Sequence, residues 1–227
     1  MLINADFSQR ATLASEQQQW VASPQNGVER VMLDRIGEEK ARATSLVRYA
    51  PNSHFPHHLH PSGEEILVLS GTFSADDDDY PTGWYLRNPP KSGHKPHSRE
   101  GAVIFVKLRQ MPASEKYHVA INTNDEINWQ LEGARMVCPL FTDDNERVSL
   151  QRLNANEQLF ADTIHGGAEV LILAGELIES SESYQRNSWL RLPIDAQSSI
   201  VAGEQGATVY LKTGHLLSVI GADITGL

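Results

Sequence analysis

The feature that most constrains this chain is that its sequence contains itself twice. When the 227 residues are shifted by 104 positions, glycine, leucine, glutamate, arginine and proline residues coincide with residues of the same type. The coinciding pairs are Gly63 with Gly167, Glu65 with Glu169, Leu67 with Leu171, Leu69 with Leu173, Gly71 with Gly175, Arg87 with Arg191 and Pro89 with Pro193, then, one residue later in register, Gly101 with Gly206 and Lys107 with Lys212. One offset held over this distance indicates a tandem duplication.

Each copy carries short apolar runs that are typical of β-strands. Residues 65–69 and 102–106 are such runs, bounded by glycine, serine, proline and aspartate. Because, apart from Glu65, they are apolar rather than alternating, we expect both strand faces to be buried. Helical periodicity is scarce, and residues 8–20 fit either a short helical turn or a polar lead-in. Many short strands in copies of about 100 residues predict an all-β chain of two antiparallel sandwiches or barrels.

A polar stretch separates the two copies. It runs from about residue 111 to residue 128 and includes Pro112, Ser114 and an Asn-Thr-Asn-Asp sequence. We therefore expect one domain over residues 1–122 and a second over residues 123–227.

Histidine is concentrated in one part of the chain, since six of the nine lie between residues 54 and 97. His58 and His60 belong to a His-Leu-His sequence, and they share one strand face because alternate residues point the same way. A Pro-Ser-Gly turn then returns the chain, so that the carboxylate of Glu64 lies beside them. A second turn, rich in proline and glycine, precedes His94 and can place it against the first three side chains.

Three neutral imidazoles and one carboxylate suit a divalent metal such as zinc, iron, manganese, nickel or copper. We predict one ion per chain, zinc in the isolated protein, with iron, manganese and nickel as the alternatives. The second copy has lost the set, because the ligand positions carry Asp162, Ile164, Ala168 and Ser198, or Ser199 in the shifted register. His165 is out of register by one residue, which turns its imidazole to the other strand face.

Other polar clusters favour structural interpretations. His54, His57 and His97 fall outside the metal spacing, so we expect them at the surface or around the ligands. The four aspartates at residues 76–79 lack the alternating ligands and downstream glutamate of a calcium loop, and they predict a solvated hairpin tip.

One acidic and one basic residue recur in both copies although the ligands do not. Glu65 and Arg87 correspond to Glu169 and Arg191. A pair that persists without the metal ligands indicates a structural role, and we expect the two members to form an ion pair.

The histidine spacing carries a family resemblance. His58-x-His60-x-x-x-Glu64, followed by Gly71, resembles the first signature of the cupins. Gly83 through Pro89 to His94 resembles the second, although Lys91 stands where a glycine is usual. The wording of residues 63–69, 80–81, 86–90 and 212–216 is similar to that of the ChrR-like cupins, which are named for the cupin domain of a zinc-binding anti-sigma factor. This resemblance implies two tandem cupin jelly-roll barrels and the same four ligands.

The resemblance also implies a function. It favours a metal-binding regulatory or sensing module, with a metal-dependent dioxygenase-type enzyme acting on a small organic substrate as the alternative. A third hypothesis is a small-ligand binding protein whose second barrel serves for dimerisation. The anti-sigma factor grips its sigma factor with an N-terminal helical domain that has its own Cys/His zinc site. Here about 27 residues without cysteine precede the first strand candidate at Val28, so we do not expect direct sigma-factor binding.

Bulk properties exclude several partners. A formal net charge of −10 disfavours nucleic acid and anionic membranes, which would repel the chain. No apolar run approaches the roughly 20 residues of a membrane span, and the first residues lack a secretory signal. The lone Cys138 lies in an apolar run and fits a reducing compartment. We therefore predict a cytoplasmic protein. We expect it to bind a small molecule at the metal and to form a homodimer.

Overall fold

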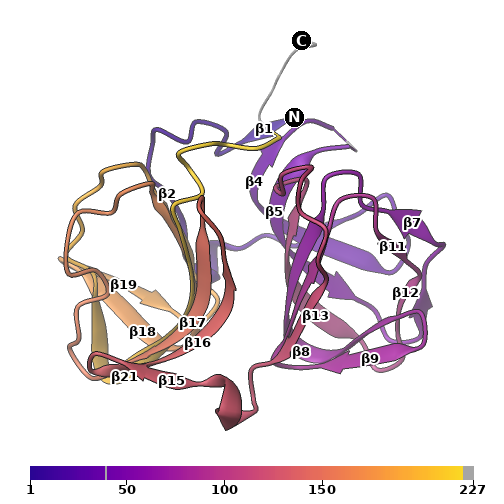
Figure 1. Cartoon of the computed structure of the whole chain (residues 1–227). Coiled ribbons are helices and arrows are strands. Elements are labelled where there is room, and N and C mark those ends of the chain that lie inside the picture. Colours follow the sequence, from indigo (N-terminus) through magenta and orange to yellow (C-terminus); the bar gives the residue numbers. More distant parts are fainter. Residues whose placement is uncertain (39, 222–227) are drawn as a thin grey trace. The chain divides into compact units, whose positions relative to one another are not determined.

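The computed structural model describes residues 1–38 and 40–221, and it is built from β-strands (Figure 1). Over these residues the other regular elements are two single-turn 3-10 helices, η1 (Ser15–Gln17) and η2 (Glu126–Asn128), and there is no α-helix. The prediction of an all-β chain is confirmed. Neither of the two short helices has the length and hydropathy to span a membrane.

The chain divides into two compact units. Unit 1 comprises residues 1–5 and 19–124 together with Ile220 and Gly221, and unit 2 comprises residues 6–18 and 125–219. The principal division falls between residues 124 and 125. The short N-terminal segment 6–18, however, belongs to the unit that otherwise contains the second copy.

Unit 1 is built on one antiparallel sheet with additional strands at its margins. The main order is β1 (Leu2–Ile3), β4 (Val28–Ile36), β5 (Arg42–Tyr49), β13 (Ala102–Leu108), β8 (Glu64–Ala75), β10 (Trp84–Asn88) and β14 (Val119–Asn122). The marginal strands are β3 (Val21–Ala22) on β4, β9 (Asp78–Pro81) on β8, and β12 (Pro96–Ser98), which pairs with both β8 and β6 (Ser53–His54). A separate two-stranded ladder joins β7 (His58–Leu59) to β11 (Gly93–His94).

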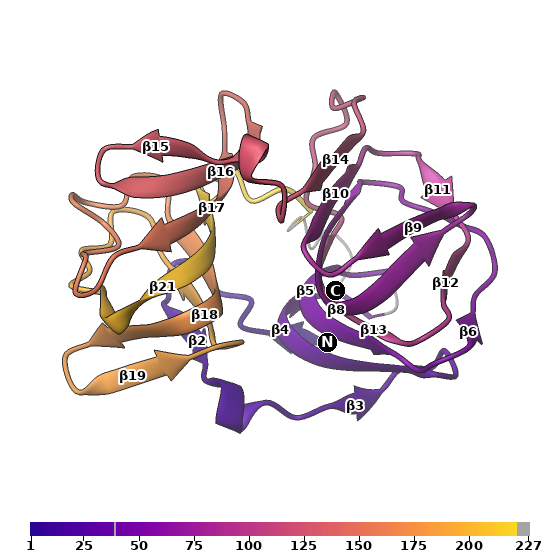
Figure 2. The ribbon, with the colours of Figure 1, turned by 90° about the horizontal axis from the view of Figure 1, so that it is seen from below.

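The strands of unit 1 form two facing layers. Figure 2 shows β4, β5, β13 and β8 on one side and β6, β12 and β11 on the other. Between them lies an apolar core to which alternate residues of β8, β10 and β13 contribute, including Ile66, Val68, Leu86, Ile104 and Val106. This alternation directs the first residue of β8, Glu64, toward the same interior face as Ile66.

The opposite face of these strands is buried as well. Its residues include Glu65, Arg87 and Lys107, each no more than 3% exposed. Burial on both faces is what the unbroken apolar runs predicted. The Arg87 Nη1 atom donates to Glu65 Oε2 at 3.0 Å, which confirms the expected ion pair in the first copy, and Arg87 also binds Glu115. Because an unpaired buried charge is costly, this network holds β8 and β10 in register.

Unit 2 is an eight-stranded antiparallel sheet. Its order is β15 (Gln130–Glu132), β16 (Arg135–Thr142), β17 (Arg147–Leu153), β21 (Val201–Thr213), β18 (Ala168–Glu179), β20 (Trp189–Leu192) and β2 (Ala11–Leu13), with β19 (Glu182–Gln185) on β18. The segment 8–20, for which we expected a short helical turn or a polar lead-in, supplies the edge strand β2 and then the single helical turn η1. Glu169 and Arg191 face each other in the β18–β20 register, and Glu169 Oε1 accepts a hydrogen bond from Trp189 Nε1 at 2.8 Å.

The duplication is visible in the strand geometry. Strands β8 and β18 each have 12 residues and begin 104 positions apart. Gly71 and Gly175 hold matching left-handed conformations, with φ of +69° and +68°. A Cβ atom at either position would lie 2.0 or 2.1 Å from the carbonyl oxygen of Gly101 or Gly206. Both copies thus require glycine where two strands approach closely.

Candidate metal centre

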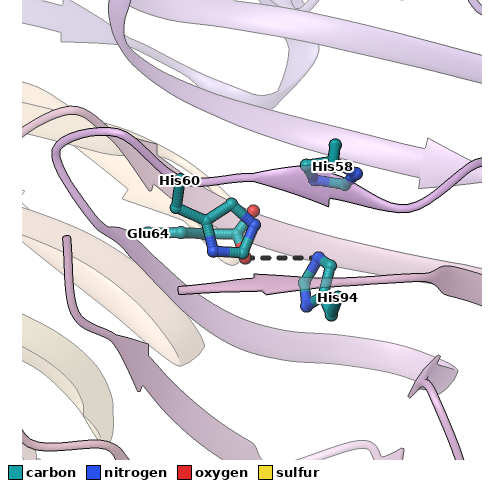
Figure 3. Close-up of side chains that lie close together, drawn as sticks. All are labelled: His58, His60, Glu64 and His94. Carbon is teal, nitrogen blue, oxygen red and sulfur yellow. Dashed lines mark ion pairs between the residues drawn. The ribbon is translucent and has the colours of Figure 1, made fainter. Parts of the chain in front are cut away.

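Three histidines and one glutamate meet inside unit 1 (Figure 3). His58 lies in β7, His60 follows that strand directly, Glu64 opens β8, and His94 lies in β11. Each residue offers one ligand atom, and the four atoms all lie within 4.8 Å of one another. The structure thus brings together the four residues that the sequence spacing selected.

The ladder of β7 and β11 positions two of the histidines. His58 and His94 are register partners, and the His60 backbone N–H donates to the Ser92 carbonyl at 2.8 Å. Lys91 donates its backbone N–H to the His60 carbonyl at 2.7 Å and adopts a left-handed φ of +72°. It therefore takes the backbone conformation for which the usual glycine of this signature is suited.

A tight turn positions Glu64. Gly63 has a left-handed φ of +80°, and a Cβ atom there would lie 2.2 Å from the Met111 sulfur. Glu64 is the register partner of both Asn88 and Leu108, so β8 is held on both sides from its first residue. Its carboxylate oxygen Oε2 lies 3.3 Å from His60 Nε2 and 3.6 Å from His94 Nε2, the latter contact being the dashed line of Figure 3.

Two polar partners around the ligands could not be identified from the sequence. The Ser92 Oγ atom lies 3.1 Å from His60 Nδ1, and Asn88 Nδ2 donates to Glu64 Oε2 at 3.2 Å. A metal bound at Nε2 would leave the ring proton of His60 on Nδ1, where the Ser92 Oγ atom can accept it. Only the fold shows these partners, because serine and asparagine in a turn are ordinary loop residues.

The electrostatics of the cluster fit a cation. Desolvation, with a smaller contribution from neighbouring imidazoles, lowers the pKa of His60 to about 3 and of His94 to about 4. Burial lowers the pKa of the more exposed His58 as well, so all three rings favour the neutral form that binds metals. Burial raises the pKa of Glu64 to about 7, although the hydrogen bond from Asn88 acts in the opposite direction and lowers this pKa.

Two nitrogen atoms of the cluster are buried without hydrogen-bond partners in the described part of the chain. They are His60 Nε2 and His94 Nε2, and both converge on the same Glu64 oxygen. Buried polar atoms are nearly always satisfied, and a divalent ion would satisfy both nitrogens while favouring the ionised carboxylate. The donor set and these orphaned atoms therefore fit a bound metal.

The sequence of the first copy matches a known protein family. Residues 8–112 match the family model of the ChrR Cupin-like domain. This segment is a ChrR Cupin-like domain. The match confirms the resemblance seen in the histidine spacing, and it covers all four residues of the cluster. Among curated proteins, none matches the sequence.

Solved structures share the cupin fold over most of the chain. A candidate dioxygenase from Nostoc punctiforme PCC 73102 has a TM-score of 0.70 and 14% identity, covering 97% of this chain and 85% of that one. A bacterial pirin from Escherichia coli in complex with nickel(II) has a TM-score of 0.67 and 11% identity, covering 90% and 98%. A cupin 2 conserved barrel domain protein from Leptotrichia buccalis has a TM-score of 0.59 and 14% identity, covering 86% and 92%. At such identities the likeness shows the fold alone.

The remaining histidines of the cupin domain lie outside the cluster. His54 and His97 stack on neighbouring strands, with ring centroids 5.6 Å apart and an interplanar angle of 10°. His57 is exposed. The aspartates at 76–79 are also exposed: Asp76 and Asp77 form the tip of the β8–β9 hairpin, close to the prediction, and Asp78 and Asp79 begin β9.

In unit 2 the positions that correspond to the ligands have other surroundings. Asp162 is exposed, Ile164 is buried in the apolar core, and Ala168 is fully buried. Ser198 donates its hydroxyl to Glu179. Over residues 1–38 and 40–221, the cluster in the cupin domain is the one group of three or more metal-binding side chains.

A cavity of about 300 Å³ borders the cluster in the cupin domain. His58, His60 and Glu64 line it, together with Tyr49 and several apolar side chains. Burial and the nearby charge of Glu64 raise the pKa of the Tyr49 hydroxyl, which therefore stays a hydrogen-bond donor at neutral pH. A metal at the cluster would thus have a small, partly apolar chamber beside it.

Proposed function

We propose that this protein is a metal-dependent enzyme that acts on a small organic substrate, with dioxygenase-type chemistry. His58, His60, Glu64 and His94 hold the divalent metal. The observation that carries the proposal is the cavity, because three of these four residues also line it. A structural site is closed by its ligands, whereas a catalytic site keeps a position open to substrate.

The metal supplies a positive charge that polarises a substrate oxygen and, when it is iron or another redox metal, a centre for reaction with oxygen. We propose zinc for the isolated protein, with iron, manganese and nickel as alternatives. The chain's own residues bind and orient the substrate. The Tyr49 hydroxyl donates a hydrogen bond in the cavity, and the apolar walls exclude water from the metal side.

The second copy has a supporting role in this proposal. We infer that both copies form jelly-roll barrels, as in a bicupin, and that the second persists for packing or homodimerisation after losing its ligands. It keeps the close strand approach at Gly175 while its ligand positions have changed. The protein as a whole is proposed to be cytoplasmic.

A second candidate function is supported by the family match. The ChrR Cupin-like domain over residues 8–112 favours a regulatory or sensing module whose signal is metal occupancy or a ligand at the metal. In this alternative the partner is a protein other than a sigma factor.

Oxygen uptake separates the two functions. Iron-loaded protein is mixed with a panel of catechols, diketones and thiols, and we expect oxygen consumption with at least one of them. His94→Ala abolishes it, whereas His165→Ala, which changes an exposed histidine of unit 2, does not. Absence of turnover over the panel, together with metal-dependent binding to a partner protein, would instead establish the sensing module.

A further inference from the structure

The cavity beside the metal ligands has a charge that contrasts with the rest of the chain. The formal net charge of the chain is −10, yet the residues lining this cavity include two cations, Lys40 and Arg109. Over residues 1–38 and 40–221, neither side chain belongs to an ion pair. Two basic residues therefore border the chamber in which a molecule bound to the metal would lie.

Arg109 is held next to the metal ligands by the backbone. It directly follows Leu108, the register partner of Glu64, and its own N–H donates to the Gly63 carbonyl at 3.1 Å. Its φ is +60°, a left-handed backbone conformation that is unusual for a residue with a Cβ atom. Such conformations in residues other than glycine are concentrated at functional sites, where the surrounding structure enforces them.

The second copy shows what this position holds when the ligands are lost. In the shifted register, Arg109 corresponds to Gly214, which has a φ of +87° and donates its N–H to Gly167 at 3.1 Å. The backbone geometry is thus the same, and glycine is the residue that suits it. Lys40 corresponds to Asp144, so the second cation is replaced by an acid. Both cations occur in the copy with the metal ligands and are absent from the copy without them.

We propose that Lys40 and Arg109 select an organic anion as the ligand of the metal site, an inference that rests on the proposed function. The ligand has an oxygen donor for the metal at one end and a carboxylate for the two cations at the other. Its carbon body packs on the apolar wall that includes Val47, Ile104 and Leu108. A chamber of about 300 Å³ is at the small end of ligand sites, so the substrate class is short-chain oxo acids.

Binding of matched acids and amides tests the proposal. Oxo acids of four to seven carbons, with the oxo group remote from the carboxylate, are titrated calorimetrically into the zinc-loaded full chain beside their neutral amides. We expect at least one acid to bind about tenfold or more tightly than its amide, with a preference that falls as salt is added. Arg109→Gln should weaken the acid by about tenfold or more, and the exposed Lys40→Gln by about two- to fivefold. Binding of the amide should stay unchanged in both variants.

Two controls make the result decisive. Arg99→Gln removes an exposed positive charge from the same unit and should leave the preference unchanged. The chelated protein should retain a weaker preference for the acids, since the cations do not depend on the metal. If every acid binds no better than its amide, or if Arg109→Gln and Lys40→Gln preserve the preference, the proposal is overturned. Anion preference without oxygen uptake by the iron-loaded protein, when the bound acids are added to the panel, would refute the dioxygenase function alone.

Discussion

The Oγ atom of Ser92 lies 3.1 Å from the Nδ1 atom of His60 and fixes which nitrogen of that imidazole faces the metal ligands. The contact joins the turn before β11 to the end of β7, the same two segments that the His60 N–H and Ser92 carbonyl connect. Such a partner strengthens metal binding, because the imidazole is already held in the orientation that the metal requires and loses little entropy when the metal binds.

Ser92→Ala should therefore weaken metal binding while leaving the fold intact. Loss of a partner of this kind lowers metal affinity by roughly 10- to 100-fold. Competition with a chromogenic chelator measures the affinity, and Ser70→Ala, an exposed serine in β8, is the matched control. Equal affinities for the two variants would show that the Ser92 contact does not orient the ligand.

Removal of the metal should lower the thermal midpoint of the protein. The ligands come from β7, β8 and β11, so an ion joins the short two-stranded ladder to the main sheet. Free metal at about 1,000 times its dissociation constant adds about 4 kcal/mol to the free energy of unfolding. Differential scanning calorimetry of loaded and chelated protein measures the shift. The His58→Ala, His60→Ala double variant should melt at one temperature with or without metal.

Glu64→Gln should stabilise the metal-free protein at high pH. The pKa of Glu64 is about 7 in the fold, above its ordinary value of 4.5, so between these values the folded state binds more protons than the unfolded one. Stability contributed by Glu64 is therefore present below pH 4.5 and is lost as the pH rises through 7, by about 3 kcal/mol. Chelated Glu64→Gln should melt above the chelated parent at pH 8 and level with it near pH 4.5. With metal the order reverses, because glutamine is a poor ligand for the ion.

Much of the site could be predicted from the sequence because its determinants are local. The ligand spacing combines strand alternation with two turns, and both are determined by neighbouring residues rather than by distant parts of the chain. Other features depend on the fold. Residues 11–13 are too few to show a strand pattern, and they form β2 only by pairing with β20. The place of Arg109 in the cavity could not be predicted either. Its alignment with Gly214 is a signal, because it puts a residue with a Cβ atom at a left-handed position that favours glycine.

Metal binding should release protons mainly from Glu64. The pKa of His60 is about 3 and that of His94 about 4, so both rings are already neutral at pH 6, whereas Glu64 is largely protonated there. We expect release of close to one proton per metal at pH 6 and about half a proton at pH 7. Calorimetry in buffers of different ionisation enthalpy measures this number. Release of two or more protons at pH 6 would mean that the imidazoles titrate near their ordinary value, contrary to their burial.

The metal content should be one equivalent per chain, because the second copy lacks what an ion needs. Its Ile164 occupies the position of His60 and is buried in the apolar core of unit 2, and Ala168 replaces the carboxylate of Glu64. Only Asp162 could still serve as a ligand, and one exposed carboxylate cannot compete with water for a divalent ion. His165 is exposed and lies 2.9 Å from Asp195, so it cannot restore the set. Elemental analysis should give one equivalent for the parent and for His165→Ala, and close to none for the His58→Ala, His60→Ala variant. Two equivalents, or one that survives the double substitution, would place the metal elsewhere in the chain.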